Sequence, residues 1–255
     1  MDIQPYLERI HFSKKLEVST DVLFQLQRNH LLHVPFENLD IHYGKKIRLD
    51  LQNLYVKIVE NKRGGFCYEL NSLFNELLQA IGFESYLISA RAFIENDTYG
   101  EEYDHMAIVV KLDKKLYLAD VGFGKFTLEP LEIAVDIPQQ DDHGLFIVDK
   151  YPGGYHRVCK LENNKMIPEY IFTLKSRKAE EFESLCEYHQ VSPLSHFTQK
   201  KVISLARPQG RITLTDDTLK MNNGDVTEIM HFAKNEFNHY LQYYFKISLK
   251  SGLKD

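Results

Sequence analysis

One amphipathic helix with sequence signals at both ends constrains the fold of this 255-residue chain more than any other feature. After Cys67, apolar side chains recur at helical spacing, at Leu70, Leu73, Phe74, Leu77, Leu78 and Ile81. Gly64 and Gly65 provide a flexible turn before Cys67, and Gly82 stands where a C-terminal cap belongs. The pattern predicts a helix that begins at or near Cys67 and ends at Gly82.

The order of the remaining patterns favours an α+β fold. Helical spacing also occurs at 3–10 and 22–26, and again after Asp50, which is a possible cap. Short strand-like segments separated by turn residues follow, at 84–93, 105–112, 116–121, 145–148, 156–161 and 170–174. The rest of the pattern predicts a helix at 178–188, strands near 202–206, 211–214 and 219–221, and a last helix at 226–240. Helices, then strands, then a mixed segment indicate α+β rather than alternating α/β, and the many short strands suggest a barrel or sandwich.

Charge and cysteine content argue against several classes of protein. The formal net charge is −5 with mixed signs, which disfavours a nucleic-acid or anionic-membrane partner. The longest apolar run, at 106–110, is too short to span a membrane, and the N-terminus has no signal-peptide pattern. Cys67, Cys159 and Cys186 are too few and too far apart for a disulfide framework or a zinc ribbon. We therefore expect a cytoplasmic protein with reduced thiols and no metal.

The start of the predicted helix is a candidate site for nucleophilic chemistry. Cys67 follows Gly64, Gly65 and Phe66, so it would lie at the helix N-terminus. Unpaired backbone N–H groups at that position stabilise a thiolate and could also stabilise an oxyanion. The alternative interpretation is a buried structural cysteine, because free cysteines are among the most buried residues.

A predicted hairpin supplies the base and the acid that a cysteine nucleophile needs. If Asp113 and Lys114 form a two-residue loop, then His105 and Asp120 lie on one face as diagonal neighbours, within reach of a hydrogen bond. A three-residue loop would place them on opposite faces. Taken separately, each is most simply a surface histidine or a turn-forming aspartate, so the hypothesis depends on the three residues occurring together.

Two further segments carry weaker signals. Gly122 and Gly124 surround Phe123 at a strand end, which permits close backbone approach to a ligand or forms a simple bulge. Lys200 and Lys201 form a charge pair that is most simply solvated, although it could meet an anionic ligand.

Four segments together resemble the arylamine N-acetyltransferase family in order and spacing. They are Pro35-Phe36-Glu37-Asn38-Leu39, Arg63-Gly64-Gly65-Phe66-Cys67-Tyr68-Glu69, Asp104-His105-Met106 and Asp120-Val121-Gly122-Phe123-Gly124. A weaker similarity surrounds Ser192-Pro193-Leu194-Ser195-His196-Phe197. The length is similar to that of bacterial members.

The resemblance implies an architecture with a papain-like Cys-His-Asp arrangement. It comprises an N-terminal helical bundle (1–85) carrying the nucleophile, a central β-barrel (86–190) carrying the histidine and the aspartate, and a C-terminal α/β lid (191–255). It also implies a ping-pong reaction in which Cys67 accepts the acetyl group of acetyl-CoA, the acyl-donor cosubstrate. An aromatic amine or hydrazine then takes the acetyl group, with His105 as the base and Asp120 orienting it.

The resemblance suggests the ligand contacts less directly. Phe36, Phe66 and Phe123 are predicted to contact the aromatic substrate. Either 122–124 or 195–200 could contact coenzyme phosphates, so Gly122, Gly124 and Phe197 are the predicted coenzyme contacts. Glu37 and Arg63 are expected to form a structural ion pair beneath the site. The same Cys-His-Asp order resembles papain-like and transglutaminase-like enzymes, which leaves an amide synthase or thiol hydrolase as the alternative function and a non-catalytic binding protein as a third.

Overall fold

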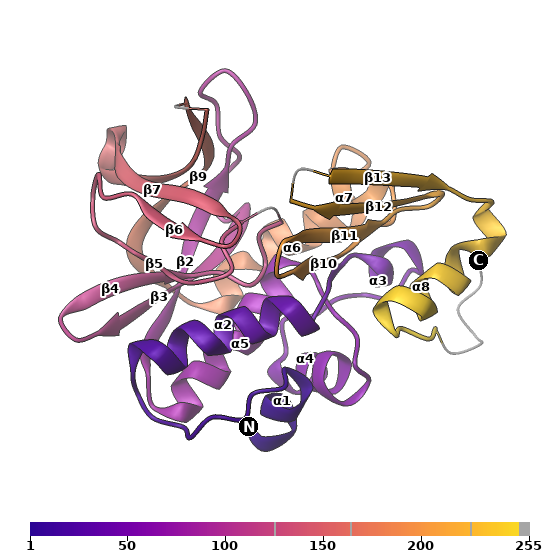
Figure 1. The fold of residues 1–255 in the computed structure, drawn as a ribbon, viewed down its shortest axis with the longest axis horizontal. Helices are drawn as coiled ribbons and strands as arrows, with labels where there is room; N and C mark the ends of the chain where they lie inside the picture. Colours follow the sequence, from indigo (N-terminus) through magenta and orange to yellow (C-terminus); the bar gives the residue numbers. More distant parts are fainter. Residues whose placement is uncertain (125, 164, 225, 250–255) are drawn as a thin grey trace.

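The computed structural model describes residues 1–124, 126–163, 165–224 and 226–249, which form a helical part and two β-sheets (Figure 1). The helical part comprises α1 (Gln4–Arg9), α2 (Thr20–His33), α3 (Leu39–His42), α4 (Leu51–Tyr55), the π-helical turn η1 (Val56–Glu60) and α5 (Cys67–Ile81). The side chain of Ser19 caps α2 and that of Asp50 caps α4. Gly82 ends α5 with a φ of 113°, so both predicted ends of this helix are confirmed.

The larger sheet has eight antiparallel strands and nearly closes into a barrel. Its strand order is β5-β4-β3-β2-β9-β8-β7-β6. The strands are β2 (Glu84–Ala92), β3 (His105–Leu112), β4 (Lys115–Ala119), β5 (Leu131–Glu132), β6 (Gln139–Asp141), β7 (Gly144–Tyr151), β8 (Tyr155–Glu162) and β9 (Lys165–Arg177). The side chain of Gln139 joins the two edge strands, since its Oε1 accepts the N–H of Glu132 at 2.7 Å and its Nε2 donates to the Glu132 carbonyl at 2.8 Å. The predicted barrel-like sheet is therefore present, with two short strands that the sequence pattern did not indicate.

The second sheet has the order β1-β10-β11-β12-β13 and takes one strand from the N-terminal part of the chain. Its strands are β1 (Phe36–Glu37), β10 (Ile203–Arg207), β11 (Gly210–Leu214), β12 (Thr218–Asn223) and β13 (Val226–His231). Between the two sheets the chain forms η3 (Ala179–Phe182), α6 (Glu183–Val191) and α7 (His196–Gln199), and after β13 it forms η4 (Lys234–Glu236) and α8 (Phe237–Phe245). A single turn, η2 (Pro152–Gly154), connects β7 to β8.

The predicted helix at 226–240 is wrong in its first half. Residues 226–231 form β13, which pairs with β12 from Asn223–Val226 to Thr218–His231, and the helix begins only at Phe237. Val226, Ile229 and Met230 have a spacing that also fits a helix, but all three are exposed on the edge strand, so no buried stripe supports that assignment. The hairpin pairing decides the structure here.

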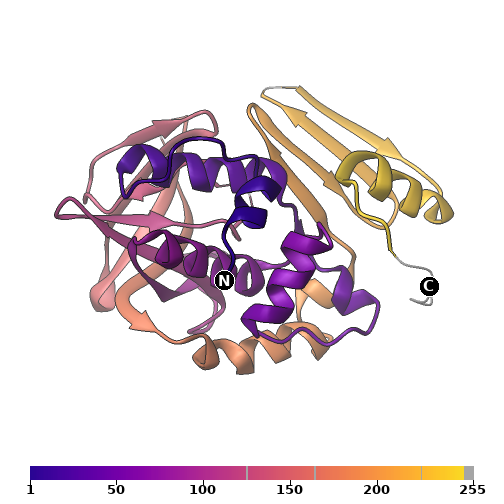
Figure 2. The ribbon, with the colours of Figure 1, turned by 90° about the horizontal axis from the view of Figure 1, so that it is seen from below.

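Three apolar cores hold these parts together. One core joins the helices to one face of β2, β3 and β4, a second fills the barrel, and a third lies between the C-terminal sheet and α8. Figure 2 shows the C-terminal sheet beside the helical part, with α8 on its outer side. Side chains alternate along this sheet, so Ile203, Ile212 and Leu214 face α8 while the residues between them face the rest of the molecule. In the described part of the chain, no helix combines the length and apolar character that crossing a membrane would require.

Candidate active site

The β3–β4 hairpin places His105 beside Asp120, as the two-residue loop predicts. Leu112 lies opposite Lys115 and Ile108 opposite Ala119. The Nε2 of His105 lies 2.6 Å from the Oδ2 of Asp120, and both side chains are buried. This nitrogen is engaged with the carboxylate, so the other ring nitrogen, Nδ1, is free to serve the thiol.

Cys67 is the first residue of α5, and a glycine allows the hairpin to approach it closely. A Cβ at Gly122 would lie only 2.6 Å from the Cα of Cys67 and 2.8 Å from the Nδ2 of Asn71. Any larger residue at this position would push the hairpin away from the helix start. Gly122 was expected to allow a ligand to approach the backbone; in the structure it allows the helix carrying Cys67 to approach, and it also lines a cavity.

Five donors hold the carboxylate of Asp120 in place. Oδ1 accepts from the Asn71 side chain at 2.9 Å and from the backbone N–H groups of Gly122 at 2.9 Å and Phe123 at 3.1 Å. Oδ2 accepts from the Tyr170 hydroxyl at 3.2 Å in addition to His105. These five hydrogen bonds keep the buried side chain in one orientation.

The environment of His105 favours the imidazolium. Burial lowers the pKa of His105, but the charge and hydrogen bond of Asp120 outweigh it, with a further contribution from Cys67, and together they raise it to about 10. Because Cys67 contributes to this shift, its sulfur lies within interaction range of the ring. A buried cysteine beside an imidazole that a carboxylate holds is the arrangement that cysteine nucleophiles use.

A buried ion network fixes the turn before Cys67. Glu69 accepts the N–H of Phe66 at 3.1 Å, and Lys57 donates to Glu69 at 2.8 Å. Lys57 also lies 2.9 Å from the Oδ2 of Asp40. The predicted pair of Glu37 and Arg63 is present at 2.7 Å and joins the same network. Burial lowers the pKa of Lys57, but the surrounding carboxylates outweigh it and raise the value above the ordinary one.

Replacing Lys57 with methionine should lower the free energy of unfolding by about 3–5 kcal/mol, because buried carboxylates would lose their nearest cation. Urea unfolding monitored by circular dichroism measures the change. Lys111→Met is the matched control, since Lys111 forms an exposed pair with Glu84 and its loss should change stability little. An equally small effect of both substitutions would contradict the role assigned to Lys57.

A cavity of about 360 Å³ opens onto Cys67 and His105. Of the predicted ligand contacts, Phe36, Phe123, Phe197, Gly122 and Gly124 line this cavity. Phe66 does not line it, because its ring is fully buried and packs edge-to-face against Phe197 at 5.8 Å between ring centres. The remaining lining residues are Ala92, Asp104, His196, Lys200, Val202, Ser204, Arg211 and Thr213.

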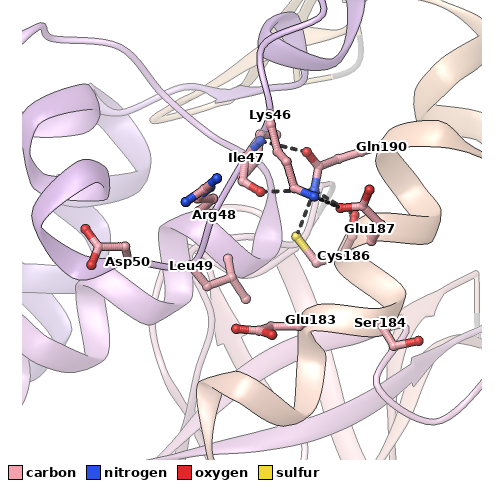
Figure 3. Close-up of a pocket in the computed structure, with 10 residues that line it drawn as sticks. All are labelled: Lys46, Ile47, Arg48, Leu49, Asp50, Glu183, Ser184, Cys186, Glu187 and Gln190. Carbon is pink, nitrogen blue, oxygen red and sulfur yellow. Dashed lines mark hydrogen bonds and ion pairs between the residues drawn. The ribbon is translucent and has the colours of Figure 1, made fainter.

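A larger hollow of about 740 Å³ lies between the 46–50 segment and α6, and its lining does not include Cys67, His105 or Asp120 (Figure 3). The Gln190 side chain crosses it, accepting the N–H of Ile47 at 2.7 Å and donating to the sulfur of Cys186 at 3.4 Å. Burial raises the pKa of the Cys186 thiol well above its ordinary value and that of Cys159, in the barrel, to about 11. Burial therefore keeps both of these thiols protonated at neutral pH.

Limiting iodoacetamide at pH 7 should therefore modify Cys67 well before the other two cysteines. A thiol with a pKa of about 11 is ionised in about one molecule in 10⁴ at this pH. Peptide mass mapping after brief treatment measures the order of modification. Equal labelling of Cys67 and Cys159 would contradict an activated thiolate at the start of α5.

Several residues of the site were not predicted from the sequence. Asn71 lies one helical turn after Cys67, so helical spacing alone could have placed it on the same face. Gln27, which accepts the N–H of Asp120 at 3.0 Å, and Tyr170 come from distant segments and carry no local signal. Arg211 also reaches the cavity from the C-terminal sheet. Across the described ranges, no group of three or more histidine, cysteine or acidic side chains is arranged to hold a metal ion.

Comparison with known proteins shows the family to which the chain belongs. The family model described as N-acetyltransferase matches residues 19–253. The arylamine N-acetyltransferase pineal gland isozyme NAT-3 of Gallus gallus is 33% identical, covering 98% of this chain and 95% of its own. The solved arylamine N-acetyltransferase structure from M. smegmatis matches with a TM-score of 0.92 at 26% identity, covering 100% of this chain and 96% of that one. The solved arylamine N-acetyltransferase structure from Salmonella typhimurium matches with a TM-score of 0.91 at 25% identity, covering 99% of this chain and 94% of that one. The chain therefore belongs to the arylamine N-acetyltransferase family and is an acyltransferase.

Proposed function

We propose that this protein transfers an acetyl group from acetyl-CoA to the nitrogen of an aromatic amine or arylhydrazine, through a thioester on Cys67. The observation that carries the proposal is the contact of His105 with Asp120 at 2.6 Å beside a cysteine at a helix start. Membership of the family supports the reaction class, and the cavity with aromatic walls next to the thiol supports an aromatic acceptor.

In the first half-reaction, the Cys67 thiolate attacks the carbonyl carbon of acetyl-CoA. The bond from that carbon to the coenzyme sulfur breaks, and the imidazolium of His105 supplies the proton that the departing thiolate takes up. The first N–H groups of a helix have no carbonyl partner within it, so those of Cys67 and Tyr68 at the start of α5 can stabilise the oxyanion that forms during the attack. Exchange of one thioester for another is nearly balanced in free energy, so loading is reversible.

In the second half-reaction, the amine attacks the acetyl thioester. An arylamine is unprotonated at neutral pH and is already a nucleophile, whereas an alkylamine is mostly protonated. The now neutral His105 accepts the proton that the amine nitrogen loses, and the Cys67 thiolate departs. The amide product leaves, and the thiolate–imidazolium pair is restored.

Initial-rate measurements over a grid of acetyl-CoA and para-anisidine concentrations test this function. Acetyl-CoA reacts with the free enzyme and the amine with the acetylated enzyme after CoA has left, so we expect parallel double-reciprocal lines and one acetylated amine for each CoA released. Intersecting lines would contradict the covalent route. Release of CoA at the same rate with or without the amine would instead identify the thiol hydrolase.

A further inference from the structure

Arg211 brings a positive charge into the cavity from the C-terminal sheet. In β11, Ile212 and Leu214 face α8, so alternation directs Arg211 and Thr213 to the opposite face, where both line the cavity with Cys67 and His105. Register supports this placement, because Thr213 pairs with Ser204 of β10, which in turn pairs with Phe36 of β1.

Among the described residues, the guanidinium of Arg211 has a polar contact but no carboxylate partner. Its Nη1 donates to the Oγ of Ser204 at 2.9 Å. Within the described ranges, no carboxylate lies within ion-pair distance of it. Burial lowers the pKa of Arg211 to about 10. A desolvated cation without a partner is costly unless a ligand supplies the negative charge.

The acidic side chains that the structure describes around Arg211 have other partners. Asp104, which also lines the cavity, lies 3.2 Å from the Nε2 of His189. An adjoining hollow shares Arg211 and is bordered by Asp142 and Glu162, which pair with Arg28 at 2.5 Å and Lys160 at 2.7 Å. The positive charge of Arg211 is therefore available to a ligand in the cavity.

We infer that Arg211 binds a carboxylate on the aromatic ring of the acceptor amine and thereby selects anionic arylamines. The inference rests on the proposed function and names the acceptor class of the same site. The cavity is of a size for one aromatic ring, and Phe36, Phe123 and Phe197 supply its walls. A para-substituted ring would place its amine toward Cys67 and its carboxylate toward the guanidinium.

A phosphate of the coenzyme is the other anion that Arg211 could meet. The long pantetheine arm separates the phosphates of CoA from its thiol, whereas Arg211 lines the same small cavity as Cys67. Lys200 is exposed and also borders the cavity, so it is better placed for a group that enters from solvent. These positions favour an acceptor carboxylate at Arg211.

The test compares para-aminobenzoate with its neutral counterpart para-aminobenzamide in the wild type and in Arg211→Met. We expect kcat/KM for para-aminobenzoate to fall roughly 10- to 100-fold, with little change for para-aminobenzamide or in the KM for acetyl-CoA. Arg211→Lys should restore part of the selectivity, because it keeps the charge but not the planar fork. Arg207→Met is the matched control, since it removes the same charge from β10 at a residue that does not line the cavity.

A binding measurement separates this inference from the proposed function. Without any acetyl donor, para-aminobenzoate should slow the alkylation of Cys67 by iodoacetamide more strongly in the wild type than in Arg211→Met. This protection requires no turnover, so it can succeed even if acetyl transfer fails. The inference would be overturned if Arg211→Met lost kcat/KM equally for both amines, or if para-aminobenzoate protected Cys67 equally in both proteins. It would also be overturned if the substitution changed only the KM for acetyl-CoA, and that result would assign Arg211 to a coenzyme phosphate.

Discussion

Replacing Cys67 with serine should lower the rate of acetyl transfer by roughly 10⁴-fold or more, because a hydroxyl at this position is a far weaker nucleophile than a thiolate. His105 and Asp120 are arranged to stabilise a charge pair with sulfur. The pKa of His105 is raised to about 10, so its imidazole favours the protonated form. It is therefore poorly suited to remove a proton from a serine hydroxyl. Formation of acetylated para-anisidine by the purified variant measures the effect.

The control for this prediction is Cys186→Ser. Cys186 is also buried, but it lines the hollow beside α6, where its sulfur accepts a hydrogen bond from Gln190, and it is not among the residues that line the cavity at Cys67 (Figure 3). We expect this variant to retain near wild-type activity, and both variants to unfold in urea close to the wild-type midpoint. Substantial activity in Cys67→Ser would exclude a covalent intermediate on this residue.

Replacing Asp120 with asparagine should lower kcat/KM by roughly 10³- to 10⁴-fold while leaving the fold intact. The asparagine oxygen can still accept from Asn71 and the backbone at Oδ1. Its amide would instead present an N–H to the Nε2 of His105, which must then carry its proton on Nδ1. That tautomer cannot accept a proton from Cys67.

The same substitution should change the pH dependence of stability. The pKa of His105 is raised from 6.5 to about 10 in the folded protein. The ion pair therefore contributes fully to stability below about pH 6.5, and this contribution is lost as the pH rises through about 10. The difference in free energy of unfolding between the wild type and Asp120→Asn should shrink over this range. As a control, Asp142→Asn changes an exposed carboxylate that pairs with Arg28, and its effect on the free energy of unfolding should not shrink over this pH range. Near-normal kinetics in Asp120→Asn would reduce Asp120 to a structural residue.

The sequence predicts those parts of the fold in which neighbouring residues decide the structure. Helix α5 follows from its apolar spacing and the glycine at its end, and the β3–β4 register follows from the length of one turn. Because register fixes which side chains share a face, that turn also places His105 next to Asp120. The candidate triad could therefore be identified without coordinates.

Features that depend on distant segments were not predictable in this way. Tyr170 and Gln27 reach Asp120 from another strand and another helix, and Lys57 neutralises carboxylates from three segments. The spacing at 226–231 fits a helix as well as a strand, and only pairing with β12 settles it. No local pattern reveals that Arg211 lines the cavity without a carboxylate partner among the described residues.

The intact mass of the protein after brief mixing with acetyl-CoA alone tests the central claim most directly. We predict that the wild type gains one acetyl group, that peptide mapping places it on Cys67, and that it disappears when para-anisidine is added, with acetylated amine formed in equal amount. Cys67→Ser should gain no such group. A wild-type protein that turns over acetyl-CoA and the amine without ever carrying an acetyl group on Cys67 would contradict the account.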